Sequence, residues 1–390
     1  STIANPSQFS LPWWSGGAEK VRLRAVSKLI YAASPRSADM LYATGFHAPD
    51  AFLFLEHRGK KSIVLNDLEI DRGRREAEVN EVLSASQLAR EFGGHSPAVI
   101  AAGLLGQRKI SRVDVPGDFP LALARTLEKA GLLVVPAEGH FWSGRELKDR
   151  SELVAIGRAT RLAAIGLERA VEVLRVAKIV RGDLLQWNGQ ALTSEIVRAE
   201  ADSAVLRAGG TPEGTIVAGG RQGCDPHERG HGRLRAHQLI ILDIFPRDAR
   251  TGYFGDLTRT VVRGRASDAQ RRLWETVCAA QRMAIRLIKP RVKGVAVHKA
   301  VQQFFIARGY RTEQMGGRWT GFFHGTGHGL GLDLHEEPRL SATVFRPGQV
   351  FTVEPGLYYP DIGGARHEDV VSVTARGCRL LSRLRVPLEL

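Results

Sequence analysis

The stretch FFHGTGHGLGLDLHEEP, residues 322–338, places three histidines and three acidic residues among four glycines. Each glycine in a helix interior costs about 0.5–1 kcal/mol relative to alanine, so this segment is not expected to form a helix. The histidines His324, His328 and His335 carry imidazoles that bind metal ions or transfer protons when acidic partners lie nearby. Strands and helices elsewhere in the chain have to supply those partners.

The overall composition is that of an ordinary globular protein. Of 390 residues, 43% are hydrophobic and 25% are charged, and this length allows two domains that each bury a core. The longest apolar runs are too short to cross a bilayer, and the N-terminal sequence lacks the basic start and apolar core of a secretory signal. We therefore expect a cytoplasmic protein with no membrane partner.

Cysteine usage and net charge argue against two further classes of protein. Cys224, Cys278 and Cys378 are an odd number without CxxC spacing, which predicts reduced thiols rather than disulfides or a thiolate metal site. The formal charge of +14 comes mostly from arginines scattered along both halves. Because no Lys/Arg-rich block with interleaved aromatic residues is present, we expect a basic surface and no nucleic-acid partner.

The first part of the chain has the pattern of an α/β domain. Short apolar runs predict strands and a longer periodic run predicts a helix that ends at Gly131. The strands are expected at 40–46, 51–57, 61–66, 111–117 and 132–138, and the helix at 120–131. We predict one domain over residues 1–145.

A long amphipathic pattern after Arg145 opens a second predicted domain, residues 146–390. Its apolar face contains one polar member, Thr160, and otherwise consists of Leu153, Ile156, Ala163, Leu167, Val171 and Leu174. Further helices are expected at 191–203, 268–289 and 295–309, and strand pairs at 237–245 with 256–264 and 349–359 with 365–374. The second domain is therefore expected to combine helices with strand pairs.

Four carboxylates lie on these predicted strand pairs. Asp243 and Asp256 are 13 positions apart, and in a hairpin an odd separation directs both side chains to the same face. Glu354 ends one apolar strand and Glu368 begins another. Either aspartate alone is equally compatible with a turn or cap, and either glutamate with a solvated strand end. Together their burial would be costly unless a cation lay between them.

The combination of four carboxylates with one imidazole favours a particular kind of metal site. Hard oxygen ligands suit a pair of divalent ions such as Mn²⁺ better than a structural zinc ion, which prefers sulfur and nitrogen. Two such ions acidify a water molecule and polarise a carbonyl group. The sequence therefore predicts a hydrolase with a dinuclear metal site.

Four segments together resemble a known family of enzymes. The segments 242–260, 324–338, 352–358 and 366–371, in this order, are similar to the ligand motifs of the pita-bread metallopeptidases, which include prolidase, aminopeptidase P, methionine aminopeptidase and creatinase. Residues 41–76 resemble the creatinase-type domain that precedes prolidases and aminopeptidases P. The implied fold is an α/β N-terminal creatinase-type domain followed by an α+β pita-bread catalytic domain.

The resemblance also implies a role for individual residues. Glu354 would additionally accept a proton from the water molecule between the metals, and the loop glycines would let the substrate backbone approach closely. The implied metal ligands are Asp243, Asp256, His328, Glu354 and Glu368, holding two ions that we expect to be Mn²⁺, with Co²⁺ or Zn²⁺ as alternatives. Catalytic roles are implied for His324, His335 and His227, and substrate or supporting contacts for Arg339, Arg366 and Tyr358.

The implied reaction is hydrolysis of the Xaa-Pro bond in dipeptides by a metal-bridged hydroxide. Arg339 matches the position at which prolidases bind the terminal carboxylate, and this favours a dipeptidase. The alternative is an aminopeptidase P that cleaves longer peptides. The resemblance also implies a homodimer. One departure from the family is a hairpin between Asp243 and Asp256 that is two residues longer, where Asp248 and Arg250 are expected at the mouth of the site.

Two other interpretations of the sequence are possible. HERGH, residues 227–231, matches the HExxH zinc-protease pattern, but that pattern requires a helix, and Pro226, Gly230 and Gly232 oppose one. A non-enzymatic binding module on the same fold is the second alternative. The presence of competent ligand types at all five family positions argues against it.

Overall fold

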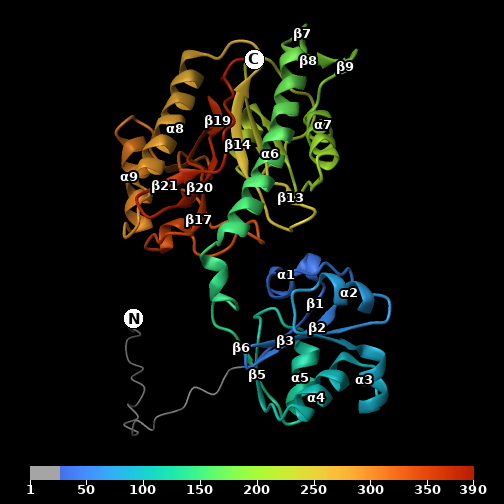
Figure 1. Cartoon of the computed structure of the whole chain (residues 1–390). Coiled ribbons are helices and arrows are strands. Elements are labelled where there is room, and N and C mark those ends of the chain that lie inside the picture. Colours follow the sequence, from blue (N-terminus) through green and yellow to red (C-terminus); the bar gives the residue numbers. More distant parts are fainter. Residues whose placement is uncertain (1–26) are drawn as a thin grey trace, which may run out of the picture. The chain divides into compact units, whose positions relative to one another are not determined.

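The computed structural model describes residues 27–390, which fall into two compact units (Figure 1). The first unit contains residues 27–31, 52–71 and 79–136, and the second contains Ala32–Ala51, Arg72–Glu78 and Ala137–Leu390. The predicted domain boundary at residue 145 stays a prediction, and the start of the first predicted domain, residues 1–26, lies outside the described residues. Among the described helices, none combines the length and apolar character needed to cross a lipid bilayer.

The first unit is built on a six-stranded sheet with the order β4-β3-β2-β1-β5-β6. β1 pairs with β5, β5 with β6 and β3 with β4 in parallel, whereas β2 and β3 are antiparallel. The strands are β1 (Ser27–Ala32), β2 (Phe52–His57), β3 (Lys60–Leu65), β4 (Glu81–Ser84), β5 (Arg112–Val115) and β6 (Leu133–Pro136), and the helices are α3 (Ala85–Phe92), α4 (Pro97–Gln107) and α5 (Leu121–Lys129). The helix α2 (Ile70–Glu76) is divided between the two units after Asp71. The predicted strands β2, β3, β5 and β6 and the predicted helix α5 are confirmed.

The predicted strand at 40–46 is wrong, because this segment forms the helix α1 (Ala38–Thr44). The side chain of Ser37 accepts a hydrogen bond from the Met40 backbone N–H at 3.2 Å and caps the start of the helix. Gly45 ends the helix in the left-handed conformation, with φ of 60°. The two capping residues decided the structure, although the apolar composition between them resembled that of a strand.

One half of the second unit packs two helices against a three-stranded sheet. α6 (Arg150–Val176) begins with a capping box formed by Asp149 and Glu152, and α7 (Ser194–Arg207) packs beside it. The predicted apolar face of α6 is buried except for Leu153, which is half-buried. The sheet has the order β11-β12-β14, with β11 (Ile216–Gly219), β12 (Leu239–Ile244) and β14 (Leu257–Val262).

The other half repeats this arrangement with the helices on the opposite side in Figure 1. α8 (Asp268–Leu287) and α9 (Gly294–Ile306) share a core with the strands β17 (Val350–Val353), β18 (Gly356–Tyr359) and β20 (Asp369–Val373). β17 pairs with β20, and β18 with β19 (Gly363–Arg366), which confirms the predicted pairing of these segments. The strand-rich layer therefore lies between two helix pairs.

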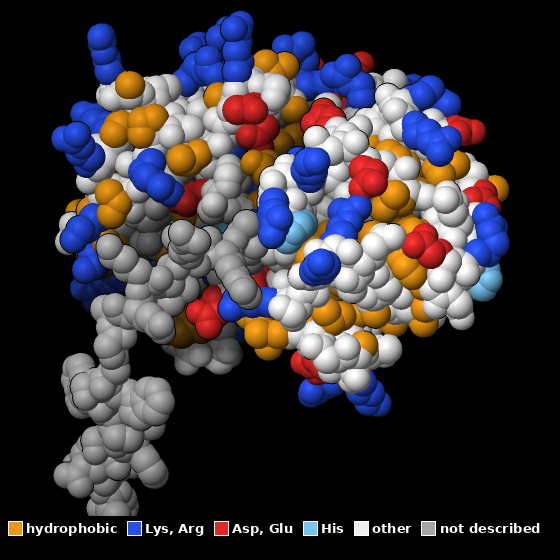
Figure 2. Space-filling view, turned by 60° about the horizontal axis from the view of Figure 1, so that its bottom comes forward, with side chains coloured by type: hydrophobic (Ala, Val, Ile, Leu, Met, Phe, Trp, Pro, Cys, Tyr) orange, Lys and Arg blue, Asp and Glu red, His pale blue; other side chains and the backbone are white. Residues whose placement is uncertain are grey.

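Short elements complete the second unit. They are strands β7 (Lys178–Val180), β8 (Leu184–Trp187), β9 (Gln190–Ala191), β10 (Gly210–Thr211), β13 (Arg247–Asp248), β15 (Glu313–Met315), β16 (Arg318–Thr320) and β21 (Cys378–Leu380), and 3-10 turns at Ser34–Arg36, Ser143–Glu146, Gly220–Cys224 and Leu340–Ala342. Lysine and arginine side chains are spread over the face shown in Figure 2, among acidic and apolar ones.

The strand registers place the four carboxylates. Asp243 pairs with Thr258 in the β12–β14 ladder, so Asp256, two residues earlier, belongs to the same face of the hairpin. Val353 pairs with Asp369 in the β17–β20 ladder, so Glu354 and Glu368 follow and precede this pair at the same end. Two strand pairs thus each deliver two carboxylates to one region of the second unit.

Candidate metal centre

A buried acidic cluster forms where these strand ends meet. Asp256, His328 and Glu368 offer ligand atoms that all lie within 4.8 Å of one another. His328 Nε2 lies 3.6 Å from Asp256 Oδ2 and 3.7 Å from Glu354 Oε1. Asp243, Asp256 and Glu368 are buried, and the side chain of Glu354 is 19% exposed. Four of the five predicted ligands therefore face a common centre, and Asp243 lies beside them on the same hairpin face.

The orientation of His328 suits a metal ligand. Its Nδ1 lies 3.0 Å from the Gly329 carbonyl oxygen, which only accepts hydrogen bonds, so Nδ1 carries the proton. Nε2 is then left with a lone pair directed at the carboxylates. Burial and the nearby His335 lower the pKa of His328 to about 4, so the imidazole is neutral at pH 7.

The carboxylates repel one another strongly. Burial and the charges of Glu368, Asp243 and Glu354 raise the pKa of Asp256 well above its usual value. Burial and Glu368 likewise raise the pKa of Glu354, and burial and Asp243 raise that of Glu368 to about 7. Such an arrangement is costly unless a cation compensates the charges.

Two unpartnered oxygens test whether these residues fit divalent ions. Oδ1 of Asp243 and Oδ1 of Asp256 are buried and have no hydrogen-bond partner among the described residues, although buried carboxylate oxygens normally have one. Oxygen donors together with one neutral imidazole are the ligands that Mn²⁺ and similar ions accept. The residues present therefore fit a divalent metal centre.

A buried hydrogen-bonded chain supports Asp243. Arg366 donates from Nη2 to Asp243 Oδ2 at 2.6 Å and from Nη1 to the Tyr358 hydroxyl at 3.1 Å. The His324 Nδ1 lies 2.8 Å from the Gly325 carbonyl oxygen, so its Nε2 accepts from the Tyr358 hydroxyl at 2.8 Å. Tyr358 is fully buried, and its hydroxyl contacts His324 and Arg366, which is the supporting position that the resemblance implied.

The remaining predicted site residues border a cleft of about 1460 Å³ in the second unit. His324 is half-buried in its wall, and burial and Arg366 lower the pKa of this histidine to about 3. His335 lies with its ring centroid 4.4 Å from that of His328. His227 is exposed on a turn, and Arg339 is 77% exposed with Nε 3.7 Å from Glu337 Oε1. The predicted catalytic and carboxylate-binding residues thus share one cleft with the acidic cluster.

The prediction that Asp248 and Arg250 lie at the mouth of the cleft is wrong. Asp248 is fully buried, where it forms an ion pair with Arg158 Nε at 2.7 Å and accepts the Arg250 backbone N–H at 2.9 Å. Neither Asp248 nor Arg250 belongs to the cleft surface. Asp248 belongs to the short strand β13, which pairs with β10 away from the cleft lining.

Two sequence predictions that involve glycine concern the loop at residues 322–338 and the HERGH motif at residues 227–231. A Cβ atom at Gly327 would lie 1.9 Å from the Thr352 carbonyl oxygen, and one at Gly329 would lie 2.3 Å from the Glu336 carbonyl oxygen. Close packing of the chain therefore requires glycine at these two positions, and the predicted approach of substrate to the loop stays a prediction. Residues 227–231 form a turn and irregular structure, so HERGH lacks the helix that the zinc-protease pattern requires.

Sequence reasoning missed several residues at this site. His298 on α9 borders the cleft, and its Nδ1 lies 2.9 Å from the Thr326 hydroxyl. Arg145 and Lys148 hold the buried Glu336 from the segment before α6. Their positions in the sequence gave no periodic or motif signal, because each depends on a partner more than a hundred residues away or on another element.

Comparisons with known proteins agree with this geometry. Residues 155–375 match the family described as metallopeptidase family M24. An Xaa-Pro dipeptidase of Pyrococcus furiosus is 34% identical over 173 residues, which cover 43% of this chain and 47% of that enzyme. The aligned part thus spans about half the length of this relative.

Two further similarities extend over nearly the whole chain. A putative dipeptidase of Bacillus subtilis, YkvY, is 27% identical over 384 residues, covering 93% of this chain and 97% of the relative. The crystal structure of an X-Pro aminopeptidase from Thermotoga maritima superposes with a TM-score of 0.79 at 22% identity, covering 93% of this chain and 96% of that one. The predicted fold, a pita-bread catalytic domain preceded by an α/β domain, is confirmed.

Proposed function

Because the chain belongs to metallopeptidase family M24, we propose that it is a metal-dependent dipeptidase that hydrolyses the Xaa-Pro bond of dipeptides. The observation that carries this proposal is the convergence of four carboxylates and the neutral Nε2 of His328 at the floor of one cleft. The similarity to an Xaa-Pro dipeptidase supports the choice of substrate.

The proposed site holds two divalent ions, Mn²⁺ in the native protein, through Asp243, Asp256, His328, Glu354 and Glu368. Bound divalent ions supply an acidified water molecule and polarise the scissile carbonyl group. Glu354 is the proposed proton acceptor, because its carboxylate is partly exposed and borders the cleft beside His328.

Three histidines on the cleft wall have proposed roles toward the substrate. His335 lies against His328, and His227 is exposed on the neighbouring turn, so both are placed to donate hydrogen bonds to a bound peptide. His324 is fixed through Tyr358 to Arg366, which keeps its ring neutral and oriented in the wall. We propose that His227 and His335 orient the Xaa-Pro carbonyl and protonate the departing imino nitrogen, whereas His324, both of whose ring nitrogens are already hydrogen-bonded, shapes the cleft wall.

Arg339 is the proposed determinant of dipeptide specificity. Its guanidinium is exposed in the cleft, and within residues 27–390 its ion pair is a long contact from Nε to Glu337 Oε1 at 3.7 Å. A terminal carboxylate could replace this weak partner with two parallel hydrogen bonds, which a longer peptide lacks at that position.

A second candidate, an aminopeptidase that removes a residue before proline from longer peptides, is favoured by the size of the cleft. Its volume of about 1460 Å³ exceeds the 300–1,000 Å³ that is common for small-ligand sites.

We further propose that the protein forms a homodimer and is located in the cytoplasm. Neither proposal affects the choice between the two peptidase activities.

The decisive experiment measures proline release from a neutral Xaa-Pro dipeptide and an Xaa-Pro-Yaa tripeptide. Chelator-stripped protein is assayed alone and after addition of Mn²⁺, Co²⁺ or Zn²⁺. Metal-dependent cleavage of the dipeptide alone is the expected result. Preference for the tripeptide would establish the aminopeptidase alternative, and cleavage of neither peptide by metal-loaded protein would refute both.

A further inference from the structure

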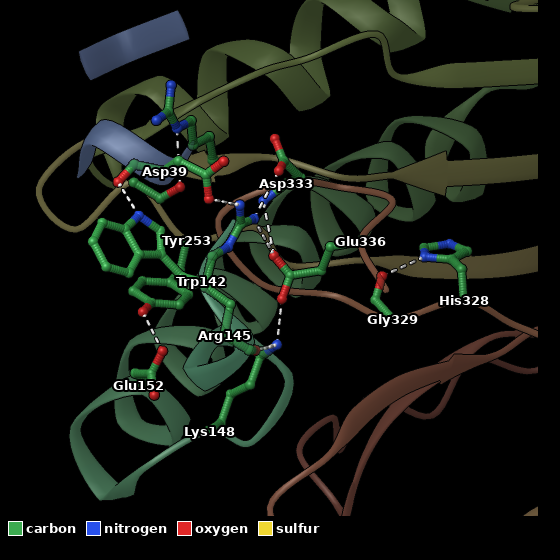
Figure 3. Close-up of polar contacts among 12 residues, drawn as sticks. Asp39, Trp142, Arg145, Lys148, Glu152, Tyr253, His328, Gly329, Asp333 and Glu336 are labelled. Atoms are coloured by element: carbon green, nitrogen blue, oxygen red, sulfur yellow. Dashed lines mark hydrogen bonds and ion pairs between the residues drawn. The ribbon is translucent and has the colours of Figure 1, made fainter. Parts of the chain in front are cut away.

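A buried cluster of charges lies where the chain enters α6 (Figure 3). Arg145 donates from Nη2 to Glu336 Oε2 and to Asp333 Oδ2, both at 2.7 Å, and from Nη1 to Asp39 Oδ1 at 2.9 Å. Lys148 Nζ forms an ion pair with Glu336 Oε1. We call these five residues the Arg145 cluster. The side chains of Arg145, Lys148 and Glu336 are 10%, 2% and 6% exposed.

The cluster is connected to His328 through one carbonyl oxygen. The Glu336 backbone N–H donates to the Gly329 carbonyl oxygen at 3.0 Å, and His328 Nδ1 donates to the same oxygen at 3.0 Å. The position of this acceptor fixes the rotation of the imidazole and therefore the direction of Nε2. By fixing Glu336, Arg145 and Lys148 consequently also fix the Gly329 carbonyl oxygen that orients His328.

The same region is connected to Asp256 by two contacts. Phe254 lies two residues before Asp256, and its backbone N–H donates to the Gly331 carbonyl oxygen at 2.8 Å. The Tyr253 hydroxyl donates to Glu152 Oε1 at 2.7 Å, and Glu152 belongs to the capping box of α6. A Cβ atom at Gly331 would lie 2.3 Å from Glu336 Oε1, so the loop and the Glu336 carboxylate are packed against each other.

Stability alone is a weak explanation for such a cluster. Removing two cations and a carboxylate from water is costly, and apolar residues of similar size often stabilise a protein as well or better. In some proteins a buried ion pair instead selects one conformation of the surrounding segments over alternative conformations. Here the arrangement that they fix includes segments bearing two of the predicted metal ligands.

We propose that the Arg145 cluster is a positioning device for the metal centre, in which Arg145 and Lys148 act through Glu336 to orient His328 and the segment before Asp256. This inference rests on the proposed function, because it assigns the metal site its supporting residues. Arg145, Lys148 and Glu336 are positioning residues, and none of them has to touch the substrate.

The test uses the full chain and the variants Glu336→Gln and Lys148→Met. The first keeps the shape of the side chain and removes its charge, and the second keeps an unbranched apolar stem. The matched control is Glu200→Gln, which breaks an ion pair of the same length, 2.7 Å, between Arg169 on α6 and Glu200 on α7. Circular dichroism establishes that each variant is folded before it is used.

Two readouts separate positioning from general stability. Calorimetric titration of stripped protein with Mn²⁺ gives the dissociation constant, which should rise about 10- to 100-fold in both cluster variants and stay within twofold in the control. Hydrogen exchange of metal-free protein should quicken at least about tenfold at the amides of Glu336 and Phe254 in the cluster variants alone.

The inference is overturned if both cluster variants bind Mn²⁺ within twofold of the wild-type protein and exchange these two amides at the wild-type rate. Neither readout requires proline release, so both decide the inference even if the wild-type protein cleaves neither test peptide. If the wild-type protein bound no metal, the proposed function would fail, and the exchange rates would still decide the positioning of the two segments.

Discussion

At the scale of single residues, Asp256 combines the largest number of unfavourable charges in the site. Burial and three neighbouring carboxylates raise its pKa, and its Oδ1 has no hydrogen-bond partner in the part of the chain that the structure describes. We predict that Asp256→Asn weakens Mn²⁺ binding on the order of 100-fold or more and abolishes peptidase activity, because an amide oxygen carries no charge to offer the ion.

The same substitution should make the metal-free protein more stable at pH 8, because it removes one of the repelling charges. Metal content after dialysis, peptide cleavage and thermal unfolding of stripped protein check the three effects. Full turnover by a metal-free Asp256→Asn protein would contradict the mechanism.

Arg339 carries the proposed preference for dipeptides. Loss of a hydrogen bond to a charged group costs about 1.5–3 kcal/mol, which corresponds to about 10- to 150-fold. We predict that Arg339→Ala lowers kcat/KM for an Xaa-Pro dipeptide by this factor and changes kcat/KM for an Xaa-Pro-Yaa tripeptide less than threefold. Equal losses for both peptides in steady-state assays would assign Arg339 a role other than carboxylate recognition.

The sequence predicted the residue types of this site better than their contacts. Asp243, Asp256, His328, Glu354 and Glu368 stand beside strand ends and glycine turns that indicate their chemistry. The bond between Arg366 and Asp243 and the burial of Tyr358 depend on how β12 packs against β19, and no local pattern encodes that contact.

At the scale of elements, helices and strands with strong periodicity were predicted and the weakly patterned ones were not. The apolar faces of α6 and α8 extend over several turns. The apolar strands of the second unit are separated from one another by proline and glycine residues that indicate turns. α1 is only seven residues long, so its composition did not distinguish helix from strand.

Two glycines on α6 give a matched test of how this helix packs. A Cβ atom at Gly157 would meet no atom within 4 Å, whereas one at Gly166 would lie 2.8 Å from Val205 Cγ2 on α7 and 3.2 Å from Ile244 Cγ2 on β12. We predict that Gly157→Ala raises the free energy of unfolding by about 0.5–1 kcal/mol. Gly166→Ala should lower it by about 1–3 kcal/mol, because the methyl group overfills a packed core.

Urea unfolding of the two variants measures this difference. The substitution is chemically identical at both positions, so the gain in helix propensity is the same and only the packing differs. A stabilising effect of Gly166→Ala would mean that α6 and α7 have room to separate at this point.

At the scale of the whole molecule, metal binding and pH should act on stability together. The raised pKa of Glu368, about 7 against 4.5, means that the folded metal-free protein binds more protons than the unfolded chain, so its stability falls as the pH rises through 7. Burial lowers the pKa values of His324 and His367 to about 3 and that of His328 to about 4. These groups make stability fall as the pH drops below about 6.5.

We therefore predict that the metal-free protein is most stable between about pH 6 and 7. Added Mn²⁺ should stabilise it increasingly from pH 6 to 8, because the ion competes with protons for the carboxylates. At a hundredfold excess over the dissociation constant the gain is about 2.7 kcal/mol. Thermal unfolding at several pH values, with chelator or with Mn²⁺, measures both trends, and a metal effect that is independent of pH would contradict them.

The sequence by itself determined the fold class, the strand pairs and a set of candidate metal ligands, because periodicity, turn residues and motif spacing act over a few neighbouring positions. It also predicted correctly that both aspartates share one hairpin face. The tertiary structure decided which charges are buried together: Arg366 with Asp243, and Arg145 and Lys148 with Glu336. These pairs join residues far apart in the chain, and their energy depends on desolvation and distance, which exist only after the elements have packed.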